Sequence, residues 1–177
     1  MKVELKANGK TVQVEMTEEQ AKILGLVEER SRTGYERVEV EETYYLVEVD
    51  DEITNMKHNG QLDRDCYDVG NYYSNKTIAE NNARADRLLR QLRQWQAQND
   101  KAISISDWKN DKINKYCIAY NYSLNELNTG MERRLRRPNA IYFSTSQKAE
   151  EAIEVFKDEL LWYFTEYVQR LDEVQNG

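Results

Sequence analysis

The feature that most constrains the fold of this chain is a short pattern that occurs twice, about 70 residues apart. The matching segments are Tyr72-Tyr73-Ser74 with Tyr142-Phe143-Ser144, Ala79-Glu80 with Ala149-Glu150, and Tyr45 with Tyr116. In both copies an aromatic pair precedes a serine, and apolar residues spaced for one helix face follow. The pattern predicts two loose copies of one β–loop–β–α unit. Convergence of unrelated segments on a common helix cap is the alternative.

The first copy is placed at residues 43–98. Its residues Tyr44–Val49 are aromatic and β-branched, which favours a strand. The polar stretch Asp50–Asp68 contains an Asn59-Gly60 turn, and a short strand then ends at Ser74, which is expected to cap a helix. This helix is predicted from about Asn75 to Gln98. Its apolar face consists of Ile78, Ala85, Leu88, Leu89, Leu92 and Trp95.

The second copy is placed at residues 113–174. Tyr116–Tyr120 and Ile141–Ser144 read as strands, and Ser144-Thr145-Ser146-Gln147 has the pattern of a capping box. One helix is predicted to follow, and its face is the clearest periodic signal in the chain. That face consists of Ala149, Ala152, Ile153, Phe156, Leu160, Tyr163, Phe164, Tyr167 and Leu171.

Two smaller regions precede the main domain, residues 43–177. Residues 1–27 predict a β-hairpin with an Asn8-Gly9 turn and a short helix that ends at Gly25. Residues 28–42 read as an acidic connector, with a short strand at Val38–Val40. The expected fold class is therefore α+β, with two β-β-α units packing two long helices on one antiparallel or mixed sheet.

The composition excludes several common function classes. His58 is the only histidine and lies in a polar turn, and the chain has no glycine-rich phosphate loop. Asp63, Asp65 and Asp68 lack the spacing of a calcium loop and are expected to form a solvated acidic loop. We therefore predict a protein that is not an enzyme and has no cofactor and no metal site.

The sequence also bears on the compartment. The apolar runs are too short for a membrane span, and no signal peptide is visible. The two cysteines, Cys66 and Cys117, are expected to be reduced and buried. These features favour the cytoplasm, and they leave the oligomeric state open.

Charge is unevenly distributed along the chain, whose net charge is −7. Residues 28–52 carry ten acids against three bases, and residues 101–145 carry eight bases against four acids. The candidate acidic partner-binding residues are Glu39, Glu41, Glu42, Glu48, Asp50, Asp51 and Glu52. The candidate residues for nucleic acid or an acidic partner are Arg84, Arg87, Arg90, Arg93, Arg133, Arg134, Arg136 and Arg137. A solvated face is the alternative for each set, because most charge runs only solvate a surface.

Several motifs resemble a group of small proteins encoded by phages, prophages and mobile elements of gut Gram-positive bacteria. The matching segments are Tyr35–Glu39, Tyr44–Val47, Val69–Tyr73, Ala83–Leu92, Ile141–Ser144 and Phe156–Tyr167. The resemblance covers about residues 33–170, and no catalytic or ligand residue carries over from it. It implies an accessory role in a mobile element, a setting in which some small acidic proteins block host defences such as CRISPR nucleases.

Three function hypotheses follow. The first is an accessory protein that binds and inhibits a host protein or nucleoprotein complex, as an anti-CRISPR inhibitor does, through its acidic residues. The second is a nucleic-acid-binding accessory protein that uses the arginine clusters. An enzyme of a new kind is the remote third.

Overall fold

The computed structural model describes residues 2–7, 10–24 and 32–173. The chain divides into two compact units, residues 1–32 and residues 33–177. Both combine helices with antiparallel strands, so the fold is α+β. Each unit is described by itself below.

The first unit contains β1 (Lys2–Ala7), β2 (Lys10–Glu15) and α1 (Glu18–Ile23). The two strands pair antiparallel with Val3 opposite Val14. The helix begins with a reciprocal cap, in which the Gln20 amide donates to the Thr17 hydroxyl and the Thr17 amide donates to the Gln20 side chain. Asn8, Gly9 and Gly25, the predicted turn and stop residues, lie outside the described residues.

The first half of the second unit contains β3 (Thr43–Val47), β4 (Ile53–Lys57), α2 (Gln61–Asp68) and α3 (Lys76–Asn99). Tyr73 forms an isolated antiparallel bridge to Tyr45 on the open side of β3. The prediction of a polar loop at residues 50–68 is wrong, because this stretch contains β4 and α2. The β4 residues have only a weak strand pattern of their own, and they form a strand because they pair with β3. The short strand predicted at Val38–Val40 does not form. The Val38 amide donates instead to the Tyr72 hydroxyl.

The second half contains α4 (Ile105–Lys109), β5 (Lys115–Asn121), β6 (Glu126–Glu132) and β7 (Tyr142–Phe143), followed by α5 (Ser146–Val155), α6 (Lys157–Thr165) and the 3-10 turn η1 (Leu171–Glu173). The strand order is β6-β5-β7, with Tyr116 opposite Phe143. In the first half, β4, β3 and the Tyr73 bridge follow the same order.

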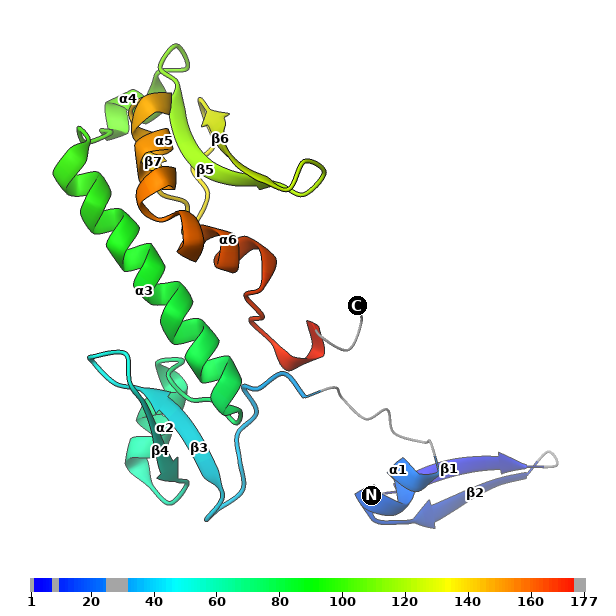
Figure 1. Cartoon of the computed structure of the whole chain (residues 1–177). Coiled ribbons are helices and arrows are strands. Elements are labelled where there is room, and N and C mark those ends of the chain that lie inside the picture. Colours follow the sequence, from blue (N-terminus) through cyan, green and yellow to red (C-terminus); the bar gives the residue numbers. More distant parts are fainter. Residues whose placement is uncertain (1, 8–9, 25–31, 174–177) are drawn as a thin grey trace. The chain divides into compact units, whose positions relative to one another are not determined.

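The two halves form separate small sheets, so the expected single sheet under two long helices is wrong. Helix α3 joins the halves, since it contacts β3 and β4 as well as α5 and α6 (Figure 1). Each described strand pairs only within its own half, so no continuous ladder runs between the halves. The main core lies where α3, α5 and α6 meet the second sheet, around Leu88, Leu92 and Phe143.

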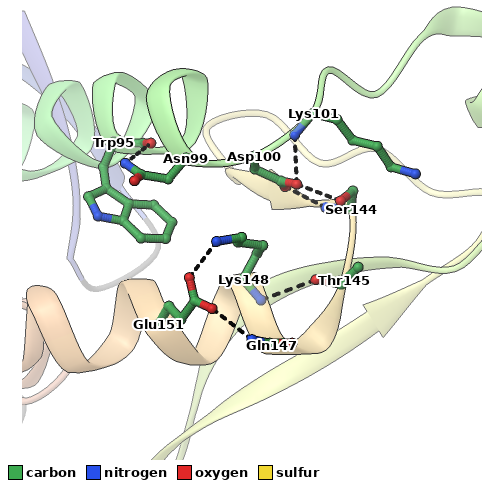
Figure 2. A network of polar contacts seen from close by, with 9 residues as sticks. All are labelled: Trp95, Asn99, Asp100, Lys101, Ser144, Thr145, Gln147, Lys148 and Glu151. Atoms are coloured by element: carbon green, nitrogen blue, oxygen red, sulfur yellow. Dashed lines mark hydrogen bonds and ion pairs between the residues drawn. The ribbon is translucent and has the colours of Figure 1, made fainter.

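The prediction that the two serines of the repeated pattern cap the helices is wrong. The caps lie one residue later, where Asn75 accepts from the Ile78 amide and Thr145 accepts from the Lys148 amide. Ser74 donates to Glu36, and Ser144 donates through its hydroxyl and amide to Asp100 at the end of α3 (Figure 2). Each serine thus ties the start of one helix to an earlier part of the chain.

The single helix predicted at the C-terminal end is divided. Phe156 ends α5 and begins α6, and residues 166–170 are not helical. The break lets α5 bury Ala149 and Ala152 near the sheet, while α6 changes direction to bury Leu160 and Trp162 (Figure 1). One straight helix presents one stripe, and these residues pack on different neighbours.

Candidate functional site

The candidate acidic residues lie at opposite ends of the β3–β4 hairpin, where they form two groups. Glu39, Glu41 and Glu42 precede β3, and backbone hydrogen bonds of Glu41 and Glu42 to His58 hold them at the end of β4. Glu48, Asp50, Asp51 and Glu52 lie in and beside the turn that joins the two strands. All seven except Asp51 are exposed. The two groups of acids, which are close in the sequence, therefore lie a hairpin's length apart in the structure.

Asp51 links the acidic turn to the arginines of α3. It has a left-handed backbone with a φ of 68°, and its carboxylate lies 3.8 Å from Arg87 and also pairs with Arg90. Its side chain is 15% exposed, whereas those of both arginines are at least half exposed. Arg87 and Arg90 therefore hold the hairpin turn against α3.

Arg84 connects α3 to α6. Its guanidinium donates to both carboxylate oxygens of Glu159, at 2.9 and 3.0 Å, and lies 3.9 Å from the centre of the Trp162 ring. The hydrogen bond to Glu159 raises the pKa of Arg84. Arg93 is exposed and forms no ion pair within the described part of the chain. Only Arg93 of the four helix arginines is left without an internal acidic partner among these residues.

The arginines that follow β6 meet a second basic segment that lies at the start of β5. Arg133 donates to the Asn114 side chain at 2.9 Å, Arg134 pairs with Asp111, and Arg137 pairs with Glu132 at 2.8 Å. Lys109 and Lys112 lie in the segment that these contacts hold in place, and both are exposed. We call the following set the basic surface: Lys109, Lys112, Arg133, Arg134, Arg136 and Arg137.

Trp108 lies beneath the basic surface. Its ring packs edge-on against Tyr142 with 4.8 Å between centroids, and the Arg136 guanidinium lies 5.9 Å from its centre. The ammonium of Lys115 is fully buried 5.1 Å from the same ring and donates to the carbonyls of Asn110 and Arg133. Lys115 therefore fixes the two basic segments to each other.

Sequence reasoning identified the four arginines of this surface and missed Lys109, Lys112, Trp108 and Lys115. The signal that could have found Lys115 is a lysine at the first position of an otherwise apolar strand. The six bases form two ion pairs, with Asp111 and Glu132, and the other four have no ion pair among the described residues. The Arg134 side chain is 74% exposed and that of its partner is 51% exposed. Exposed pairs are worth about 0–1 kcal/mol, so a phosphate can replace the carboxylate.

His58 and Asp63 form part of a buried polar network, so the expected solvated turn and solvated acidic loop are wrong here. The Asp63 carboxylate is 2% exposed and accepts from the Tyr44 hydroxyl at 2.7 Å and from the amides of Asn59 and Gly60. His58 Nδ1 lies 3.8 Å from this carboxylate and 3.4 Å from the Tyr72 hydroxyl. Helix α2 brings Asp63 beneath the hairpin. The network holds α2 on β3.

Metal and membrane features are absent from the described residues 2–7, 10–24 and 32–173. Within these ranges, no three His, Cys, Asp or Glu side chains gather as they would around a metal ion. Within the same ranges, no helix has the length and apolar character that crossing a membrane requires. Cys66 and Cys117 are free thiols, of which Cys117 is buried and Cys66 partly buried.

Comparison with known proteins adds no assignment to these surfaces. No family model, no curated protein and no solved structure matches the chain.

Proposed function

We propose that the protein is a non-enzymatic accessory protein that binds nucleic acid through the basic surface. The observation that carries the proposal is the convergence of residues 109–112 and 133–137, which the buried Lys115 ammonium fixes at Arg133 and Asn110. Four of the six bases have no acidic partner among the described residues, and exposed cations of this kind release counterions when they neutralise phosphates.

The setting proposed for this activity comes from the resemblance to small proteins of phages and mobile elements. We place the protein in the cytoplasm of a bacterial host, where nucleic acid is accessible to it. The net charge of −7 makes non-specific binding over the whole molecule unfavourable. Binding is therefore confined to the basic surface.

Salt-dependent binding tests this function. Anisotropy of labelled duplex DNA and of single-stranded RNA is measured between 20 and 200 mM salt, on the order of the range in which phosphate contacts dominate. The test variant is Lys109→Ala/Lys112→Ala, and the matched control is Lys57→Ala/Lys157→Ala, which removes the same charge elsewhere. The test variant should lower the slope of log K against log salt by roughly 2, while the control leaves it unchanged. Wild-type protein that binds neither probe at the lowest salt excludes the proposal.

A second candidate is the inhibition of a host protein, such as a nuclease of a CRISPR complex, by the acidic residues. It is favoured by the exposed carboxylates of Glu39, Glu41, Glu48, Asp50 and Glu52, which have no ion pair among the described residues. A carboxylate surface of this kind can occupy a nucleic-acid channel. Nuclease assays with wild type and with Glu48→Gln/Glu52→Gln test it. Uninhibited nuclease, or equal inhibition by both proteins, rejects it.

The proposed history of the second unit is a duplication of one β-β-α segment. It is supported by the shared strand order, by the helix caps at Asn75 and Thr145, and by the paired contacts of Ser74 and Ser144 with carboxylates. An alignment of relatives in which the two halves resemble each other more closely would support the duplication. Relatives whose halves diverge at these positions favour convergence.

A further inference from the structure

An open groove separates the outer edge of β6 from one flank of α5. The groove has a volume of about 600 Å³, and its apolar floor includes Leu127 and Ile153. β6 is an edge strand of seven residues, and no described strand pairs with its outer side. An unpaired strand edge presents backbone donors and acceptors to any extended chain that enters beside it.

The α5 side of the groove is acidic. Glu150, Glu151 and Glu154 line it from consecutive turns of one helix flank. Glu151 is partly neutralised by Lys148 at 2.6 Å (Figure 2). Glu154 is exposed and has no ion pair within the described residues. The Lys148 hydrogen bond lowers the pKa of Glu151, so that its carboxylate stays ionised at neutral pH. The groove therefore favours a positively charged occupant.

In the first half, part of α3 is covered by residues 167–171, which follow α6. The Asn81 side chain of α3 donates to the carbonyl of Val168 at 3.1 Å, and the Tyr167 hydroxyl donates to Asn82 at 2.8 Å. Val168 and Leu171 pack there against the cluster that contains Ile78 and Ala79. Asn81 lies 70 residues before Glu151, the spacing of the repeated pattern. Of the α3 residues that this segment contacts, Asn81 is the one whose counterpart lines the groove.

We propose that the groove between β6 and α5 binds an extended, basic segment of a partner protein. The segment adds as a strand to the outer edge of β6, and its lysine or arginine side chains face Glu150, Glu151 and Glu154. Its apolar side chains rest on Leu127 and Ile153. This site is separate from the basic surface and opposite in charge, so it adds a protein partner to the proposed nucleic-acid binding.

A defined peptide tests the strand addition directly. The probe is a fluorescein-labelled decapeptide in which Lys and Val take turns at every second position, so that both lie on the strand face toward α5, with Thr at the positions between them. Its binding to the full chain is followed by anisotropy at low salt. Two further peptides carry N-methyl groups on one or the other alternating set of amides. In an antiparallel or parallel strand only one set faces β6, so one N-methylated peptide should bind like the parent and the other should lose binding. Equal binding by both contradicts strand addition.

Charge variants locate the peptide in the groove. Glu150→Gln/Glu154→Gln should weaken binding about tenfold, whereas Glu39→Gln/Glu41→Gln, which removes the same charge from another surface, should change it less than about twofold. Equal weakening by both pairs, or no binding of the parent peptide by wild type at millimolar concentration, overturns the proposal. A third outcome also overturns the proposal: the protein binds no peptide but dimerises with increasing concentration, and Glu150→Gln/Glu154→Gln abolishes the dimer. The occupant of the groove is then a second copy of the chain. Lys109→Ala/Lys112→Ala should bind the peptide normally, which separates this test from that of nucleic-acid binding.

Discussion

Gly34 occupies a position that no other residue should fill without loss of stability. It is buried with a φ of +94°, and a Cβ at this position would lie 2.8 Å from Ile78 Cγ1 and 3.1 Å from Ile78 Cβ. A left-handed backbone costs an L-residue roughly 1–2 kcal/mol, and overpacking a filled site costs about 1–3 kcal/mol. Gly34→Ala should therefore lower the free energy of unfolding by about 2–5 kcal/mol.

Urea unfolding followed by tryptophan fluorescence measures this loss. The three tryptophans, at positions 95, 108 and 162, all lie in the second unit, so the signal reports on that unit alone. Gly60→Ala is the matched control, because a Cβ there has nothing within 4 Å and the backbone is extended. The control should be neutral or stabilising by up to about 1 kcal/mol.

A double variant separates the two causes. Ile78→Ala removes the Cγ atoms that clash, so Gly34→Ala should cost less in that background than in the wild type, by about 1 kcal/mol or more. If Gly34→Ala is no more destabilising than Gly60→Ala, the close packing of residue 34 against Ile78 is refuted. If the losses at 34 and 78 simply add, the steric part of the reasoning is refuted.

Three further perturbations follow from contacts in the same unit. Burial by itself raises the pKa of Glu36, but hydrogen bonds from the Thr33 amide and hydroxyl outweigh it and lower that pKa to about 2. A depressed carboxylate pKa stabilises the fold above pH ~4.5 and loses this contribution as the pH falls toward 2, so acid titrations of Glu36→Gln should lack that part of the slope. Arg84→Ala should cost about 1–2 kcal/mol in urea unfolding and Arg93→Ala less than about 0.5, because only Arg84 has the paired carboxylate and stacked ring. Asn71→Ala should cost about 1–3 kcal/mol, since its side chain pairs with both the amide and the carbonyl of Val47; a loss below 0.5 kcal/mol, on the order of a surface change, contradicts that role.

The candidate surfaces could be predicted from the sequence only in part. The Arg133–Arg137 cluster is evident from composition, but its aromatic base and two additional lysines depend on contacts across 18 residues or more. The groove beside α5 is not visible in the sequence, because an edge strand and a helix flank form it only after both have folded. The partial neutralisation of the α3 arginines by Asp51 is likewise a tertiary fact.

The sequence by itself determined the positions of α3 and α5 and the α+β class, because helix periodicity and local capping act over only a few residues. The tertiary structure decided the rest. β4 and β6 became strands by pairing with β3 and β5, and the C-terminal helix broke at Phe156 because its apolar residues pack on different neighbours. The burial of Lys115 and Asp63 also depended on long-range partners, since a charged group enters a core only where distant carbonyls, hydroxyls or amides satisfy it.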